Sequence, residues 1–277
     1  THLKQERLPI HIYHYNELEF APERVLNHMM QHILNNDADI DYIFPLDADE
    51  FIYCPSREKL NAFLTLIPQN RVGMYIWRGY LPHSTEYDPD FIFHFTDQRK
   101  EEILTPKVII PRAIAETCTL TIGSHSVRDK EGKEVQSIVF IGSNNQQFYY
   151  WFINRFNAEF IETDDLWLGH YPIRSTVQQI KKVLEKSITM VMEKKGYRDS
   201  AWENQLRDLL AHNLDISLDE LRLIAYNYRA SDEKKIQIAR QQPLRSTKLA
   251  LKYQDLINND PLPILARLIL ELAQKLR

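Results

Sequence analysis

The spacing of apolar residues predicts helices in both halves of the chain. A helix is expected from about Pro22, because proline suits the first turn of a helix and the apolar residues after it recur at helical spacing. These residues are Val25, Leu26, Met29, Met30, Ile33 and Leu34. After His170 the same period returns in Val177, Ile180, Val183, Leu184, Ile188 and Val191. Further helices are predicted over 60–66, 202–210, 218–227 and 264–276.

Shorter runs, rich in β-branched and aromatic residues, predict strands between these helices. They cover 8–15, 41–46, 72–80, 91–95 and 107–110. Residues 123–127 read as a turn leading into a strand, and 129–132 as a polar hairpin tip. The strand, helix, strand order of the first part predicts a right-handed crossover in a largely parallel sheet.

The fold class expected from this order is α/β, a mostly parallel sheet flanked by helices. Residues 1–190 would form this part, and 191–277 a helical C-terminal region, although no linker rich in glycine or serine separates the two.

Charge, hydrophobicity and cysteine content indicate which partners and which cell compartment to expect. The 34 basic and 38 acidic residues give a net charge of -4, which does not predict a nucleic-acid surface. No run reaches 18 apolar residues, the first residues lack the apolar segment of a secretory signal, and the two cysteines are far apart. We therefore expect a cytoplasmic protein with ordinary thiols.

The helical tail admits two interpretations. Its apolar residues occupy more than one face, which favours packing against the rest of the protein. Peripheral association with the inner face of the membrane, or docking of a partner helix, is the second interpretation. It draws on the basic residues of the tail, which acidic Asp255 and Glu271 dilute: Lys248, Lys252, Arg267, Lys275 and Arg277.

Candidate chemistry is concentrated in the sequence Asp47-Ala48-Asp49-Glu50, directly after an apolar run. Three carboxylates this close raise one another's pKa unless a cation lies between them. In open α/β sheets, ligands bind beyond the carboxyl ends of strands. Oxygen ligands suit Mg²⁺ or Mn²⁺, particularly when phosphate oxygens complete the coordination shell. A solvated acidic turn that caps the next helix is the alternative, but Phe51 and Ile52 pull this turn toward the protein body.

The segment 41–52, Asp-Tyr-Ile-Phe-Pro-Leu-Asp-Ala-Asp-Glu-Phe-Ile, resembles the LDADEF signature of family 2 glycosyltransferases from bacterial polysaccharide gene clusters. Three further stretches resemble the same group in the same order. They are Ile76-Trp77-Arg78, then 106–112 with Gly123-Ser124-His125, then 169–175 followed by Lys181 or Lys182. The resemblance covers residues 8 to about 190.

The resemblance implies a GT-A fold and a metal-dependent, inverting transfer of a hexose. The donor would be a UDP- or GDP-sugar, the acceptor a glycan or a lipid-linked molecule, and the metal Mn²⁺ or Mg²⁺. Asp47 and Asp49 would face the metal and diphosphate, with Asp49 the better candidate for direct ligation. His170 would be a further metal ligand, with His125 as its rival. Only 46 residues precede Asp47, so the resemblance also implies a chain that starts inside the domain, as a fragment or as a shortened relative.

Other residues are weaker candidates. Asp47, Lys107, Arg174 and Lys181 would contact the donor, and His125 the acceptor. Trp77 and Tyr80 would form either a platform for a sugar ring or part of the core. A carboxylate base is needed for the acceptor proton, and it would come from Asp97, Glu101, Glu102 or Glu50, of which Glu50 more naturally supports the metal shell.

Two other functions use the same residues. A metal-dependent phosphohydrolase or nucleotidyltransferase could employ the acidic sequence. A non-catalytic remnant that binds glycan or a partner protein would account for the short N-terminal part.

Overall fold

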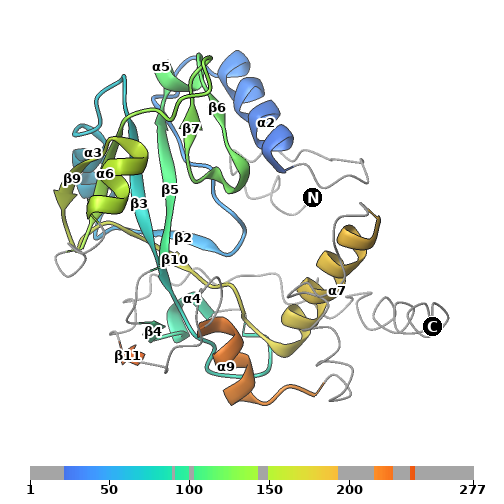
Figure 1. The fold of residues 1–277 in the computed structure, drawn as a ribbon. Coiled ribbons are helices and arrows are strands. Elements are labelled where there is room, and N and C mark those ends of the chain that lie inside the picture. The colour runs from blue at the N-terminus through green and yellow to red at the C-terminus, as the bar shows by residue number, and fades with distance from the viewer. Residues whose placement is uncertain are drawn as a thin grey trace.

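The computed structural model describes residues 22–88, 91–99, 103–142, 149–192, 215–226 and 238–240 (Figure 1). The strand predicted over 8–15 and the helices predicted over 202–210 and 264–276 lie outside these residues. No helix in the described ranges is long and apolar enough to span a membrane.

A mixed sheet of seven strands forms the centre of the protein. Its strands are β1 (Tyr42–Ile43), β2 (Glu50–Tyr53), β3 (Val72–Gly79), β5 (Ile103–Pro111), β8 (Ser137–Ile141), β9 (Glu159–Glu162) and β10 (Trp167–His170). Three of the pairings are parallel, β3 with β8, β3 with β10 and β8 with β9. Three are antiparallel, β1 with β5, β3 with β5 and β2 with β10. The prediction of a mostly parallel sheet is therefore wrong in this respect, while the α/β class is confirmed.

Strand β3 organises the sheet because it pairs with three other strands. Its first edge pairs with β5. On the other edge Val72–Tyr75 pairs with β8, and Trp77–Gly79 pairs with β10. Strand β2 then pairs with β10, so the segment that follows the acidic residues is joined to the centre of the sheet through β10.

Helices cover both faces of the sheet. Helices α2 (Pro22–Asn36) and α6 (Tyr149–Phe156) pack through Met30 and Phe152 on the face that carries Met74 and Val108. Helix α3 (Arg57–Leu64) packs through Phe63 on the face that carries the alternate residues, among them Tyr75, Trp77 and Ile109. The short helices α5 (Arg112–Ala115) and η1 (Ile122–Ser124) lie near α2 together with the hairpin of β6 (Thr119–Leu120) and β7 (Val127–Arg128).

The remaining elements gather beyond the end of β3 that leads to α4, away from α2 (Figure 1). They are α4 (Phe91–His94), α7 (Thr176–Met192), α9 (Leu218–Tyr226), and the strand pair of β4 (Asp97–Arg99) with β11 (Ile238–Arg240). Helices α7 and α9 share a core with Leu81 and Ile173, two residues that follow β3 and β10. The predicted boundary at residue 190 falls inside α7.

Most predicted elements in the described ranges are present. The helices expected from about Pro22 and over 60–66, 177–191 and 218–227 correspond to α2, α3, α7 and α9, and the strands expected over 72–80 and 107–110 correspond to β3 and β5. The strand predicted over 91–95 is wrong, because Phe91–His94 forms the helix α4, and the amide of Phe95, the next residue, donates to the Phe91 carbonyl at 2.8 Å. Phe91 and Phe95 lie one turn apart and are both buried, and so short an apolar run has no period that separates helix from strand.

Gly169 is a position where the packing of β10 admits no side chain. A Cβ atom there would lie 2.3 Å from Cε2 of Tyr53, whose ring stacks on Trp167 and Tyr80. We therefore expect Gly169→Ala to lower the free energy of unfolding by about 1–3 kcal/mol through overpacking. Denaturant unfolding measures this change. The control is the same substitution in a Tyr53→Leu background, where the loss should be smaller, and an equal loss in both backgrounds would contradict the packing argument.

Candidate functional site

The acidic residues form a tight turn between β1 and β2. The Glu50 amide donates to the Asp47 carbonyl at 3.1 Å, and the Asp47 amide donates back to Oε2 of Glu50 at 2.9 Å. These two hydrogen bonds close the turn from both ends. They also point the carboxylate of Glu50 into the protein, while Asp47 stays more than half exposed.

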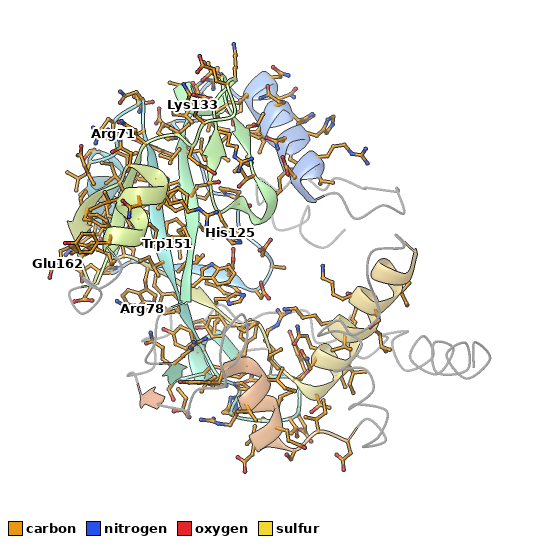
Figure 2. The ribbon with its side chains drawn as sticks, in the orientation of Figure 1. Arg71, Arg78, His125, Lys133, Trp151 and Glu162 are labelled. Atoms are coloured by element: carbon orange, nitrogen blue, oxygen red, sulfur yellow. The ribbon has the colours of Figure 1, made fainter. Side chains whose placement is uncertain are left out.

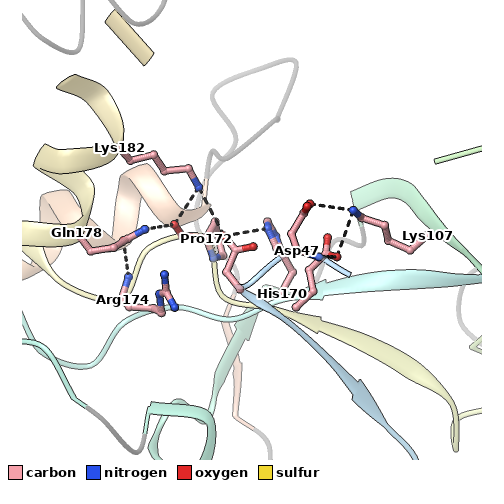
Figure 3. A network of polar contacts seen from close by, with 9 residues as sticks. Asp47, Lys107, His170, Pro172, Arg174, Gln178 and Lys182 are labelled. Atoms are coloured by element: carbon pink, nitrogen blue, oxygen red, sulfur yellow. Dashed lines mark hydrogen bonds and ion pairs between the residues drawn. The ribbon is translucent and has the colours of Figure 1, made fainter. Parts of the chain in front are cut away.

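A lysine on β5 neutralises this turn from inside the protein. Lys107 is completely buried, and its Nζ lies 2.8 Å from Oδ2 of Asp47 and 3.2 Å from Oε2 of Glu50 (Figure 3). Lys107 pairs across the sheet with Tyr75 and lies on the face that also carries Ile109. The sequence predicted that Lys107 contacts the donor, but its ammonium is directed at two carboxylates of its own chain.

Burial dominates the chemistry of Glu50. Desolvation raises the pKa of its carboxyl from 4.5 to about 7, against the opposing effect of the nearby Lys107 ammonium. Within the part of the chain that the structure describes, Oε1 of Glu50 has no hydrogen-bond partner. Glu50 thus lies beneath the turn, paired with Lys107, and it is not exposed to an acceptor. That it supports a metal shell stays a prediction.

Asp49 faces the opposite way and meets residues from β10 and α7. Its Oδ2 lies 3.9 Å from Nε2 of His170 and 3.7 Å from Nζ of Lys182. The pairing of β10 with β2 sets this geometry, because it places His170 opposite Glu50, and the Tyr171 amide donates to the Asp49 carbonyl at 2.9 Å.

His170 is held in place by Trp77. The two rings stack with their centroids 4.0 Å apart and an angle of 19° between their planes, and both side chains are buried. The Trp77 and Tyr80 side chains are both at most 4% exposed, so the structure gives them the core role and not that of an open platform for a sugar. Asp164 and Asp165 precede His170 closely in the sequence, but Asp164 pairs with Arg78 at 3.1 Å and Asp165 pairs with Lys59.

His125, the rival to His170, contacts different groups. Its Nδ1 is 2.8 Å from the Pro106 carbonyl oxygen, and its ring meets Trp77 edge to face with centroids 5.6 Å apart. In Figure 2, His125 lies between the end of the sheet marked by Lys133 and the end marked by Arg78. Of these two histidines, His170 is the one whose ring nitrogen lies close to a carboxylate of the acidic turn in the described ranges.

Two neighbouring lysines on α7 have different partners. The Nζ of Lys182 is 3.2 Å from the Pro172 carbonyl as well as near Asp49, whereas Lys181 lies 3.7 Å from Glu185, one turn along the helix (Figure 3). The sequence predicted Lys181 as the donor contact, with Lys182 as the alternative, and the helix turns Lys182 to the site. Arg174 has its guanidinium 5.4 Å from the centre of the Phe91 ring, and its Nε finds no hydrogen-bond partner among the described residues.

The predicted bases are placed as follows. Asp97 lies on β4 and forms an ion pair with Arg222 of α9 at 2.6 Å, which is a structural role. Glu50 is enclosed with Lys107, as described above. Glu101 and Glu102 lie outside the described residues.

A divalent ion fits part of the predicted ligand set. Ligand atoms about 2.1 Å from one octahedral ion are about 3 Å apart when adjacent and about 4.2 Å apart when opposite. The Asp49 oxygen and the His170 nitrogen are 3.9 Å apart, between these two values, so a small side-chain rotation would be needed for both to bind one ion. Asp47 does not join them in this arrangement. In the described ranges, the one group of three His, Cys, Asp or Glu residues with ligand atoms all within 4.8 Å is a different one, namely His83, Asp88 and His94.

Sequence reasoning missed that Lys107 pairs with Asp47 and Glu50 inside the protein, and that Lys182, not Lys181, lies beside Asp49. A lysine between Pro106 and the apolar run Val108-Ile109-Ile110 is a signal for the first, because a charged residue in a buried strand requires a partner. For the second, Lys182 is two residues after Ile180 and one before Val183, which does not by itself fix the direction of its side chain.

Searches against protein-family models, curated proteins and solved structures found no match to this chain.

The raised pKa of Glu50 makes a prediction about stability. The folded state holds a proton on Glu50 up to about pH 7, whereas the unfolded state releases it near 4.5. Stability from this group is therefore fully present below pH 4.5 and is lost as the pH rises through 7, by up to about 3 kcal/mol. We expect the free energy of unfolding of the wild type, measured in EDTA from pH 4.5 to 8, to fall relative to that of Glu50→Gln. Parallel curves for the two proteins would contradict the assignment.

Proposed function

We propose that this protein is a GT-A glycosyltransferase that moves a hexose from a nucleoside-diphosphate sugar to a glycan or lipid-linked acceptor, with inversion and with Mn²⁺ or Mg²⁺. The observation that supports it best is the meeting of Asp49 and His170 at 3.9 Å. These residues come from two separate stretches that resemble family 2 glycosyltransferases, and the sequence predicts both as metal ligands.

The charges around Asp49 suit a metal and a diphosphate. Asp49 and His170 would hold the ion, and phosphate oxygens would complete its shell. When bound, the ion supplies positive charge that stabilises the leaving diphosphate. Lys182 of α7 lies beside Asp49, and Arg174 lies on the loop between β10 and α7, so these two cations are the candidates for holding the phosphates.

Asp47 and Lys107 contribute by fixing the turn. The Lys107 ammonium holds the Asp47 carboxylate, and the Asp47 amide is bonded to Glu50. This arrangement keeps the backbone of the turn in one conformation, so the carboxylate of Asp49 is preorganised for the ion without rearrangement of the strand. Of the predicted bases, Glu101 and Glu102 remain predictions, whereas Asp97 and Glu50 have partners within the protein.

Loss of the Asp49 carboxylate should abolish the reaction. With the full chain, Mn²⁺ and a panel of UDP- and GDP-sugars, we expect release of nucleoside diphosphate, and at least about a 100-fold lower rate for Asp49→Asn. The isosteric amide keeps the fold, which circular dichroism checks. Release of nucleoside monophosphate would favour a phosphohydrolase or nucleotidyltransferase. Absence of Mn²⁺-dependent nucleotide binding would favour a non-catalytic remnant.

Lys182 and Lys181 offer a matched pair of variants. Lys182→Met removes the ammonium beside Asp49 and should lower kcat/KM for the donor by about 10- to 100-fold, since a charged contact to phosphate is worth about 1.4–2.7 kcal/mol. Lys181→Met removes a cation that pairs with Glu185 on the exposed side of α7, and should leave kcat/KM within about twofold. Equal losses in the two variants would exclude a specific role for Lys182.

A further inference from the structure

A second group of metal-ligating side chains lies where β3 leads into α4. Nε2 of His83 is 3.5 Å from Oδ2 of Asp88, and Nδ1 of His94 is 2.7 Å from the same oxygen. The candidate ligand atoms of the three residues all lie within 4.8 Å of one another. The His83 and His94 side chains are about half exposed, whereas Asp88 between them is 15% exposed.

The backbone around this group is held by contacts of its own. The Leu81 amide donates to the Asp97 carbonyl at 2.9 Å, and Arg222 donates to the Pro82 carbonyl at 2.9 Å. The Phe91 amide donates to the Asp88 carbonyl at 3.3 Å, which ties Asp88 to the start of α4. The three side chains are therefore carried by segments with fixed positions, as a binding site requires.

The rings are also oriented by apolar contact. The imidazole of His83 stands edge to face against the buried ring of Phe95, with centroids 5.1 Å apart and planes at 80°. The rings of His83 and His94 are 6.1 Å apart at 89°. One side of the group is thus an apolar wall, and the other is open to solvent, from which an ion and a water ligand can enter.

One of the two separations is close to that around a tetrahedral ion, and the other is shorter. Ligand atoms about 2.05 Å from zinc lie about 3.3 Å apart, close to the distance from His83 to Asp88. The distance from His94 to Asp88 would have to widen by about 0.6 Å, which the half-exposed His94 side chain at the end of α4 permits. Two imidazoles and one carboxylate suit zinc better than Mg²⁺, because Mg²⁺ favours oxygen ligands.

We propose that His83, Asp88 and His94 form a zinc site with an open fourth position for water, distinct from the acidic turn at Asp49. Bound zinc would clamp the segment after β3 to the end of α4. Phe91 of α4 packs edge to face on Tyr171, with centroids 5.1 Å apart, and Tyr171 directly follows His170. The ion would therefore have a structural role, stiffening the elements on which the candidate active site rests.

Zinc binding by the full chain tests this site. The measurement is a calorimetric titration of Zn²⁺ into metal-free protein. This protein carries Asp49→Asn, so that the acidic turn does not contribute a second binding site. We expect one ion per chain, and at least about a 10-fold weaker affinity after His94→Gln or Asp88→Asn, because even outer-shell partners of a metal are worth that much. His28→Gln, an exposed histidine on α2, is the matched control and should bind zinc as its parent does.

A Co²⁺ titration gives a second readout, because tetrahedral Co²⁺ bound by His83, Asp88 and His94 should show a visible absorption band that His94→Gln abolishes. The proposal is overturned if the Asp49→Asn protein binds no zinc, or if His94→Gln and Asp88→Asn bind it as tightly as their parent. Zinc that binds to the wild type but not to the Asp49→Asn protein would also overturn it. That result would leave the proposed glycosyltransferase function untouched.

Discussion

The ammonium of Lys107, buried beneath the acidic turn, is the interaction on which the candidate site depends. Two carboxylates of the turn, those of Asp47 and Glu50, share this one cation. Removing a charge from water costs several kcal/mol, so a buried ammonium is stable only where carboxylates accept its hydrogen bonds. The lysine and the turn therefore hold each other in place, and the direction of Asp49, which makes no contact with Lys107 in the described ranges, follows from the backbone that they fix.

The three acidic residues consequently have three different environments. Asp47 is more than half exposed and forms an ion pair with the buried Lys107. Glu50 is buried and has a raised pKa. Asp49 lies close to His170 and Lys182. Sequence reasoning directed both Asp47 and Asp49 at the metal and diphosphate and favoured Asp49 for direct ligation, but spacing alone carries no information about the direction of a side chain. The structure separates them through a partner on β5, 60 residues away.

Local signals account for the elements that were predicted correctly. The apolar period of α2 and α7 and the β-branched run of β3 specify those elements without reference to the rest of the chain. The order of strands could not be obtained in this way, because β3 pairs with β8 and β10, which follow it by more than 50 residues. Resemblance to a family predicted that His170 belongs with the acidic turn, whereas the stack of Trp77 on His170 and the choice of Lys182 over Lys181 arise only from packing.

The most direct test of the account is to locate the metal. Crystals of the full chain grown with Mn²⁺ and UDP or GDP, with diffraction recorded at the manganese absorption edge, would show the ion by its anomalous signal. The account predicts manganese coordinated by Asp49 and His170, with the diphosphate oxygens on its open side and beside Lys182. Manganese and nucleotide bound elsewhere, with the Asp49 carboxylate left in contact only with protein, would contradict it.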